Sequence, residues 1–487
     1  MKKNSVIKAI LFTFLAYVLL SWIIPGGTFS GSNYTKGVIA PVGLSDLFIH
    51  PILTASTSIF VLVGLVILLI GGLYGVINKT GVYQKLVDGV VKKFTGKEKV
   101  FLIISILVFA ILASLTTLTL PLLIMVPFFV AVILLLGYNR MTALLSTVGA
   151  ILVGNMGSVF GYNAGGYNYI YEFFKVKTTD NIIAKIVLFV LLLVCLLIFV
   201  IKTSKIEKVG PKKGRKTTKK KEAEEEVKEE IVVPLYKKVE ESKKSTKPLY
   251  IVMIITLIIA LVGMYCWTGL TNKETSVFID AYQKIADIKF NGQNVLANLI
   301  GSVNPFGHWT NYELAMLIII TTIVIGFVYN LKVKETFEAF VEGMKEMLPV
   351  AAVAILANIL LLVVNTVSSV FFVTIFDFFF GLCKNAKDLG IAINSFIGSV
   401  GYNDFTYLMN ILQQPASALY AKDLPHVVYI MQSMFGFAMM IFPTSMVLVI
   451  GLQYLNISFK EWFKENWKLL LGLLLVAIVS IIIFGLI

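Results

Sequence analysis

Long apolar stretches without a charged side chain run through most of this chain, and many reach about 20 residues, the length of a helix that crosses a bilayer. Hydrocarbon cannot bond backbone N–H and C=O groups, so a spanning segment must be a helix or part of a closed barrel. Only 14% of the 487 residues are charged, against roughly 25% in soluble domains. The sequence therefore predicts an all-α polytopic membrane protein whose surroundings are the lipid bilayer.

Two apolar stretches lead into nearly the same polar phrase, which contains two glycines each time. It reads GSVFGYN at 157–163 and GSVGYN at 398–403. A broken helix at membrane depth persists only where protein or a water-filled cavity surrounds its backbone. Broken helices in both halves of a chain are typical of secondary transporters, which bind solute between two repeats. We therefore expect one transport site to which both halves contribute.

Positive charges on the connecting segments predict how the chain crosses the membrane. Lys2, Lys3 and Lys8 place the N-terminus in the cytoplasm of a multi-pass protein of the cell membrane. Residues 1–201 form the first predicted repeat. Its elements are a span at 9–24, an amphipathic entry at 44–52, a span at 53–77, an interfacial helix at 82–94, a hairpin at 100–136, a broken span at 141–160 and a closing span at 182–201. The alternative for 100–136 is one long kinked span.

A strongly charged segment at 202–247 separates the two halves. It holds 16 Lys and Arg residues and 9 Glu residues, a mixture that predicts a solvated cytoplasmic linker. The acidic residues between 222 and 230 interrupt the basic stretch, so we expect no binding of nucleic acid. Residues 248–309 add one more span at 249–267 and a polar extracellular stretch at 268–309.

The second predicted repeat, residues 310–487, repeats the order of elements in the first. We expect a span at 314–331, an amphipathic entry at 336–347, a span at 348–364, an interfacial helix at 371–382, a hairpin at 391–420, a span at 427–450 broken at 443–445, and a closing span at 469–487. Because the extra span adds one crossing, the two halves start on opposite sides of the membrane, which is an inverted repeat.

Four breaks would meet at the centre of such a fold: the hairpin tips at 116–119 and 398–404 and the broken spans at 157–163 and 443–445. Half-helix N-termini there favour a carboxylate, and hydroxyl, amide and carbonyl oxygens suit Na⁺. The alternative is that the hydroxyls satisfy helix backbones and the glycines allow close packing. The predicted substrate-binding residues are Thr117, Thr119, Ser158, Asn163, Ser399, Asn403, Asp404, Thr444 and Ser445.

Asp404 is the most informative of these residues, because ionisable groups within a membrane are functional candidates by default. It directly follows Asn403 at the second hairpin tip. Its carboxylate would pair a cationic group of the substrate, bind a coupling ion or carry a proton. The alternative is an N-cap for the helix that follows, since aspartate is a favoured capping residue.

Residue types that build enzyme centres are sparse. His50, His308 and His426 lie far apart, and the three cysteines are scattered along apolar or interfacial segments. This distribution indicates neither a metal site nor a catalytic centre. We expect no enzyme and no cofactor other than a coupling ion, Na⁺ or H⁺. Monomer and homodimer both stay open.

Several short motifs, in their order along the chain, resemble the YfcC and C4-dicarboxylate uptake C carriers of the ion transporter superfamily. They are WIIPGG at 22–27, PVGL at 41–44, GGLYGV at 71–76, KTG at 79–81, GYNRMTA at 137–143, FVEGMKE at 340–346, PTS at 443–445 and ISFKEW at 457–462. The resemblance implies a secondary carrier with a scaffold and a moving transport part that holds both hairpins. Relatives carry dicarboxylates, basic amino acids or peptides.

The motifs at the expected site differ from that family pattern. The first broken span usually reads Gly-Ser-Thr-x-Asn-Pro-Phe in the family, the first hairpin tip is usually acidic, and the second tip usually reads Pro-Ser-Ser-Ser-Gly-Gln. This chain has GSVFGYN, threonines and GSVGYN at these places. We therefore expect an elevator-type secondary transporter, ion-coupled or exchanging, for a small carboxylate-bearing solute such as an amino acid or organic acid. An ion channel and a carrier of short peptides are the alternatives.

Overall fold

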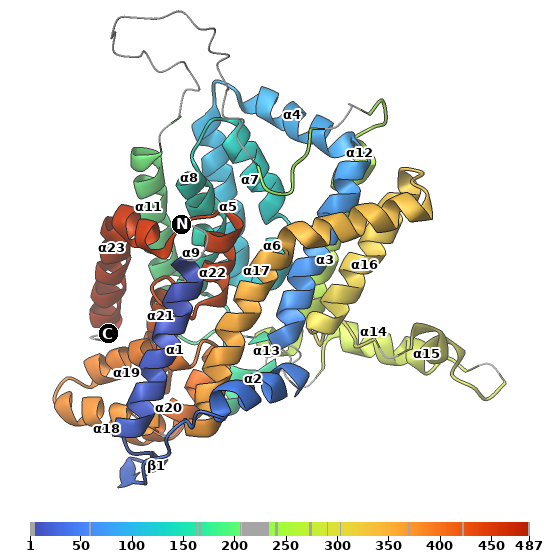
Figure 1. Cartoon of the computed structure of the whole chain (residues 1–487). Helices are drawn as coiled ribbons and strands as arrows, with labels where there is room; N and C mark the ends of the chain where they lie inside the picture. Colours follow the sequence, from blue (N-terminus) through green and yellow to red (C-terminus); the bar gives the residue numbers. More distant parts are fainter. Residues whose placement is uncertain are drawn as a thin grey trace, which may run out of the picture.

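A computed structural model represents the chain, and nearly all of it folds into helices (Figure 1). The structure describes residues 5–485 except 58–59, 162, 165–166, 205, 207–232, 239–241, 272–274, 290, 302, 369–370 and 421–422. Lys2, Lys3 and most of the predicted linker thus lie outside the described residues. In the described part, seven helices are long and apolar enough to cross a membrane. The protein is an all-α polytopic membrane protein.

The first half follows the predicted order of elements, with a short strand pair after the first helix. Its helices and strands are α1 (Ser5–Ile23), β1 (Gly27–Ser30), β2 (Asn33–Lys36), α2 (Asp46–Thr57), α3 (Phe60–Lys79), α4 (Val82–Phe94), α5 (Glu98–Thr116), α6 (Thr119–Leu123), α7 (Val126–Leu135), α8 (Arg140–Leu144), the π-helical turn η2 (Leu145–Gly149), α9 (Ala150–Met156), β3 (Asn163–Ala164), β4 (Tyr167–Asn168), α10 (Tyr169–Phe174) and α11 (Ile182–Thr203). Each strand pair is antiparallel.

The second half begins after the charged segment. Its helices are α12 (Lys247–Met264), α13 (Trp267–Thr271), α14 (Val277–Ala286), α15 (Val295–Ile300), α16 (Asn311–Val328), α17 (Val333–Ser368), α18 (Phe371–Leu382), α19 (Lys387–Gly401), α20 (Phe405–Leu419), α21 (Leu424–Met439), α22 (Met446–Tyr454) and α23 (Phe459–Gly485). We call the face where α11 ends and α12 begins the linker side, and the opposite face the far side (Figure 1).

Both predicted hairpins are present. In the first, α5 and α7 both pack on α4, and Tyr138, just after α7, forms a β-bridge with Ile206, just after α11. The segment therefore enters and leaves on the linker side, which excludes the single kinked span. In the second, Tyr420 Oη donates to Lys387 O at 2.6 Å. The first residue of α19 therefore lies beside the end of α20, and the two helices form a hairpin.

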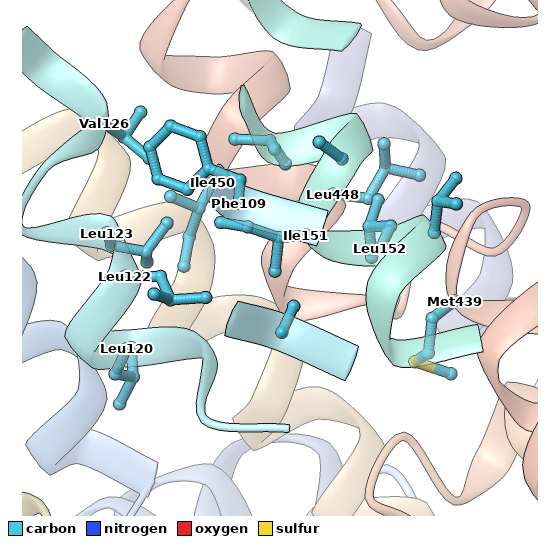
Figure 2. Close-up of a cluster of buried hydrophobic side chains, with 14 of the residues drawn as sticks. Phe109, Leu120, Leu122, Leu123, Val126, Ile151, Leu152, Met439, Leu448 and Ile450 are labelled. Atoms are coloured by element: carbon cyan, nitrogen blue, oxygen red, sulfur yellow. The ribbon is translucent and has the colours of Figure 1, made fainter. Parts of the chain in front are cut away.

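The helices pack in two groups that meet along α17. In the scaffold group, α3 packs along α17 and α16, and α12 packs on α16. In the hairpin group, α9 packs on α5, α11 and α21, and α21 packs on α19, α20 and α23. An apolar cluster in the hairpin group joins the first hairpin to the two broken helices. It includes Phe109 and Leu122 of the hairpin, Ile151 of α9 and Leu448 of α22 (Figure 2). α17 contacts α22, which brings the two groups together.

Some predicted boundaries were wrong. The amphipathic entry at 336–347 and the span at 348–364 form one helix, α17, which continues through Pro349. The polar stretch after the extra span, for which no elements were predicted, holds three helices, α13, α14 and α15. The closing helix α23 begins ten residues before the predicted span, because its first turns are amphipathic and helical outside the apolar run.

Candidate functional site

A cavity of about 540 Å³ lies where the two groups of helices meet. Its wall includes Thr117 and Thr119 from the first hairpin tip, Asn403 and Asp404 from the second, and Ser445 from the second broken helix. The scaffold group completes the wall with three residues, which are Val63 of α3, Asn358 of α17 and Asn311 of α16. Three of the four predicted breaks thus converge on one polar cavity.

The first hairpin tip is a sharp turn held by threonine hydroxyls. Thr117 follows α5 with a φ of 55°, a left-handed conformation that is uncommon for residues other than glycine. Its Oγ1 donates to Gly161 O at 3.0 Å, which fastens the tip to the loop after α9. Thr119 begins α6, and its Oγ1 accepts a hydrogen bond from Asn155 Nδ2 of α9 at 3.3 Å. The tip therefore presents hydroxyl and amide groups to the cavity.

The second hairpin tip carries the charge of the site. Asp404 is the N-cap of α20, and its Oδ1 accepts from Thr406 N at 2.8 Å. Asn403 Nδ2 donates to Asn358 Oδ1 at 2.8 Å and to Thr444 O at 3.3 Å. Asn403 thereby joins the hairpin tip to the scaffold helix α17 and to the break before α22.

The second broken helix contributes a helix start to the cavity. Ser445 caps α22, where its Oγ accepts from Leu448 N at 3.4 Å and its carbonyl accepts from Val449 N at 3.0 Å. Met446 and Val447 precede these two bonded amides in the chain, and both residues line the cavity. Amides in the first turn of a helix have no partner within it, and they carry the positive end of the helix dipole. This helix start is suited to a carboxylate.

The charge of the lining is unusual for a site that would receive an anion. Among the described lining residues, Asp404 is the only carboxylate, and none is lysine, arginine or histidine. The other polar groups there are neutral hydroxyls and amides. A doubly negative solute would bring its charge beside the carboxylate of Asp404 without a basic side chain in that lining.

Five of the nine predicted site residues line the cavity: Thr117, Thr119, Asn403, Asp404 and Ser445. Thr444 lies outside the lining and contacts it through its carbonyl, which accepts from Asn403. Asn163 pairs its backbone with Asn168 in the strand pair β3–β4, and its side chain lies outside the described residues.

Ser158 and Ser399 lie outside the cavity lining, and their hydroxyls form hydrogen bonds with backbone groups. This is the alternative that the sequence left open. Ser158 Oγ accepts from Gly161 N at 3.0 Å. Ser399 is fully buried within α19, and its Oγ donates to Ser395 O one turn earlier. Small hydroxyls on helices commonly bond the carbonyl four residues before them.

Three asparagines of the cavity lining, Asn155, Asn311 and Asn358, were missed from the sequence. Asn155 lies on α9 and Asn358 on α17, and both line the cavity. Each is an amide within an apolar helical run, and a polar side chain in such a run is costly unless it has a partner or a function. That pattern was available in the sequence, but it stands outside the glycine-containing breaks.

The fold and the cavity define a class of protein: a helical membrane protein with two hairpins and a polar cavity between two helix groups. The family model of the C4-dicarboxylate anaerobic carrier (DcuC) matches residues 4–485, nearly the whole chain. The protein belongs to this family of membrane carriers. No curated protein matches the chain significantly.

Proposed function

We propose that this protein is a secondary carrier for a small solute that bears both a carboxylate and an ammonium group, such as an amino acid. The observation that carries the proposal is the charge of the cavity: Asp404 is the sole carboxylate of its described lining, and basic side chains are absent from that lining. The family match supports transport of a carboxylate.

A zwitterion satisfies both ends of this cavity. Its ammonium would pair with the Asp404 carboxylate, and its carboxylate would lie at the start of α22, near Met446 and Val447. The hydroxyls of Thr117 and Thr119 and the amides of Asn155 and Asn358 would bond the remaining polar atoms. Buried charges are tolerated when they are paired and hydrogen-bonded, and a zwitterion brings no net charge into the membrane.

Transport would follow from movement of the hairpin group against the scaffold group, as in an elevator-type carrier made of two inverted repeats. The cavity wall includes Asn311 at the start of α16, and the other end of this helix lies on the linker side, where Tyr329 Oη donates to Ser245 O. The conformation described would therefore admit solute from the far side, which is extracellular if the N-terminus and linker are cytoplasmic. The hydrogen bond from Asn403 to Asn358 crosses the boundary that must slide.

A dicarboxylate is the second candidate, and the family match favours it. In this cavity a dicarboxylate would need cations to offset its own charge and that of Asp404, so its transport would depend on Na⁺ or on protons. The site motifs that depart from the family pattern favour the zwitterion. The motifs outside the site support a place among the YfcC and C4-dicarboxylate uptake C carriers.

Uptake into proteoliposomes tests the proposal, with Na⁺ and H⁺ gradients imposed separately. The solutes are amino acids, C4-dicarboxylates, short peptides and the N-acetyl derivative of each amino acid, which keeps the carboxylate and loses the ammonium. We expect saturable uptake of at least one amino acid and no competition by its N-acetyl derivative.

Two other outcomes would overturn the proposal. Saturable uptake of dicarboxylates alone, dependent on a cation gradient, would establish the second candidate. Single-channel currents without saturable uptake of any solute would show a channel.

A further inference from the structure

A short segment of the chain crosses the linker side between the two helix groups. It comprises residues 233–238, a described part of the charged segment that precedes α12, and we call it the strap. Leu235 and Val233 are 2% and 6% exposed, although the segment belongs to neither a helix nor a strand. Burial of apolar side chains in a charged linker is unexpected for a solvated connection and indicates specific docking.

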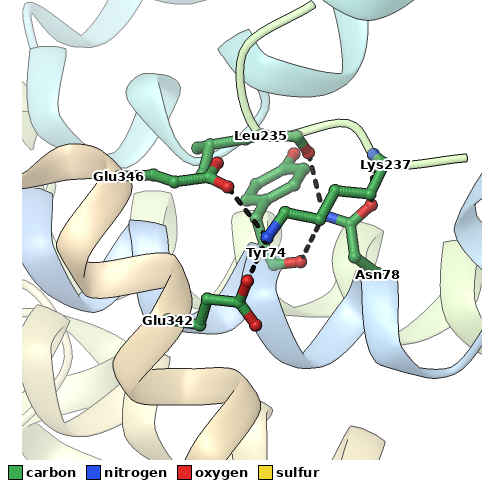
Figure 3. Close-up of polar contacts among 6 residues, drawn as sticks. All are labelled: Tyr74, Asn78, Leu235, Lys237, Glu342 and Glu346. Carbon is green, nitrogen blue, oxygen red and sulfur yellow. Dashed lines mark hydrogen bonds and ion pairs between the residues drawn. The ribbon is translucent and has the colours of Figure 1, made fainter.

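The scaffold group holds the strap at its centre through Asn78, a buried residue near the end of α3. Asn78 Nδ2 donates to Leu235 O at 2.9 Å, and Asn78 Oδ1 accepts from Lys237 N at 3.0 Å (Figure 3). An asparagine that bonds both a carbonyl and an amide imitates the pairing between two strands. Leu235 has a φ of 55°, an uncommon conformation for leucine, which these bonds maintain.

Charged and phenolic groups add contacts to the scaffold helix α17 and to α4, the helix on which the first hairpin packs. Lys237 Nζ lies 2.7 Å from Glu342 Oε1 and 3.0 Å from Glu346 Oε1, both on α17 (Figure 3). The hydrogen bond from Lys237 lowers the pKa of Glu342, so this carboxylate stays ionised. Tyr236 Oη donates to Asp88 of α4 at 3.0 Å.

The hairpin group contacts the same strap from the other side. Tyr454 Oη, at the end of α22, donates to Pro234 O at 3.1 Å. A cavity of about 490 Å³ lies between α17 and the end of α22, and the strap forms one of its walls together with Val350 and Tyr454. The strap thus touches both groups whose relative movement the proposed transport requires.

We propose that the strap is an autoinhibitory latch that holds the two helix groups in the far-side-open arrangement and slows transport until it detaches. The proposal rests on the proposed function only in its effect on uptake, because the latch itself is a contact between described parts of the chain. Each polar contact across it contributes modestly, so detachment is reversible. Detachment would remove the tie between Tyr454 and Pro234 at the end of α22 and open the linker-side cavity.

The test reverses the charge that faces Glu342 and Glu346. Lys237→Glu places three carboxylates together and should detach the strap. Val350→Cys, a buried wall residue of the linker-side cavity, reports the opening by its rate of reaction with a membrane-impermeant maleimide, measured on its own peptide by mass spectrometry. We expect this rate and the initial rate of uptake to rise about fivefold, the factor that one net hydrogen bond is worth.

Three further variants separate a latch from a structural contact. Lys243→Glu makes the same charge change at an exposed lysine nearby and should leave both rates unchanged. Adding Glu342→Lys and Glu346→Lys to Lys237→Glu should restore slow labelling, and Asn78→Ala should speed labelling without any charge change.

Labelling that stays slow in folded Lys237→Glu and Asn78→Ala proteins would overturn the latch, as would a fall in uptake accompanying fast labelling. If no variant transports any solute, the proposed function fails, while labelling still decides whether the strap detaches.

Discussion

Asp404→Asn should reduce amino acid uptake by at least about a hundredfold, which corresponds to the roughly 3 kcal/mol lost when one partner of a buried ion pair is removed. Asn403 and the start of α20 hold Asp404 at the cavity wall, where its carboxylate would meet the ammonium group of the solute. Asparagine caps helices about as well as aspartate, so this substitution removes the charge and keeps the cap. Initial rates of uptake and competition binding measure the effect.

Asp423→Asn is the matched control. Asp423 caps α21 by accepting from His426 N at 3.2 Å, so it has the same helix position as Asp404 but lies outside the cavity lining. Its substitution should leave uptake and affinity unchanged. If Asp404→Asn transports as fast as this control, Asp404 is a helix cap alone, and the assignment of the ammonium site fails.

The elements of the fold could be predicted because the physics of the membrane acts locally. A backbone break in an apolar run has to be buried in protein, and Gly157 and Asn403 stand at such breaks. Lysines before residue 100 and Arg140 after residue 136 indicated a segment that returns to its own side, and the contacts of α4 with α5 and α7 agree. The inverted relation between the halves stays a prediction.

The boundaries and the exact lining of the cavity needed the structure. The amphipathic pattern of 336–347 changes to an apolar pattern at 348. This change indicates where the helix enters the membrane, and helix α17 continues through it. Likewise, Ser399 and Asn403 stand in one phrase, but Ser399 faces the carbonyl of Ser395, while Asn403 reaches Asn358. Which side of a turn faces the cavity depends on packing partners that lie far away in sequence.

The strap shows the same dependence on distant partners. Composition predicted a solvated linker over 202–247, and no periodic pattern distinguishes residues 233–238 within it. Their binding site is formed by Asn78, by carboxylates on α17 and by Tyr454, which are brought together only by the fold. A segment of six residues can be docked by complementary groups without any secondary structure of its own.

Gly75→Val should prevent the scaffold group from assembling. Gly71 and Gly75 are one helical turn apart on α3, and both face α17 at Gly343. A Cβ at Gly71 would lie 2.5 Å from Gly343 O, and one at Gly75 would overlap Ala339 O, so the helices meet backbone to backbone. Small residues four apart allow this approach in membranes, where packing drives association. Because a backbone cannot move aside as a side chain can, we expect a loss of about 3 kcal/mol of stability or more.

Gly89→Ala provides the control for this prediction. Gly89 lies on α4, and a Cβ there would meet no atom within 4 Å, so alanine should be neutral or add about 0.5–1 kcal/mol through its higher helix propensity. Thermal unfolding in detergent, followed by size-exclusion chromatography, compares the two variants. A monodisperse Gly75→Val protein that melts at the wild-type temperature would contradict the close crossing of α3 and α17 on which the scaffold group is built.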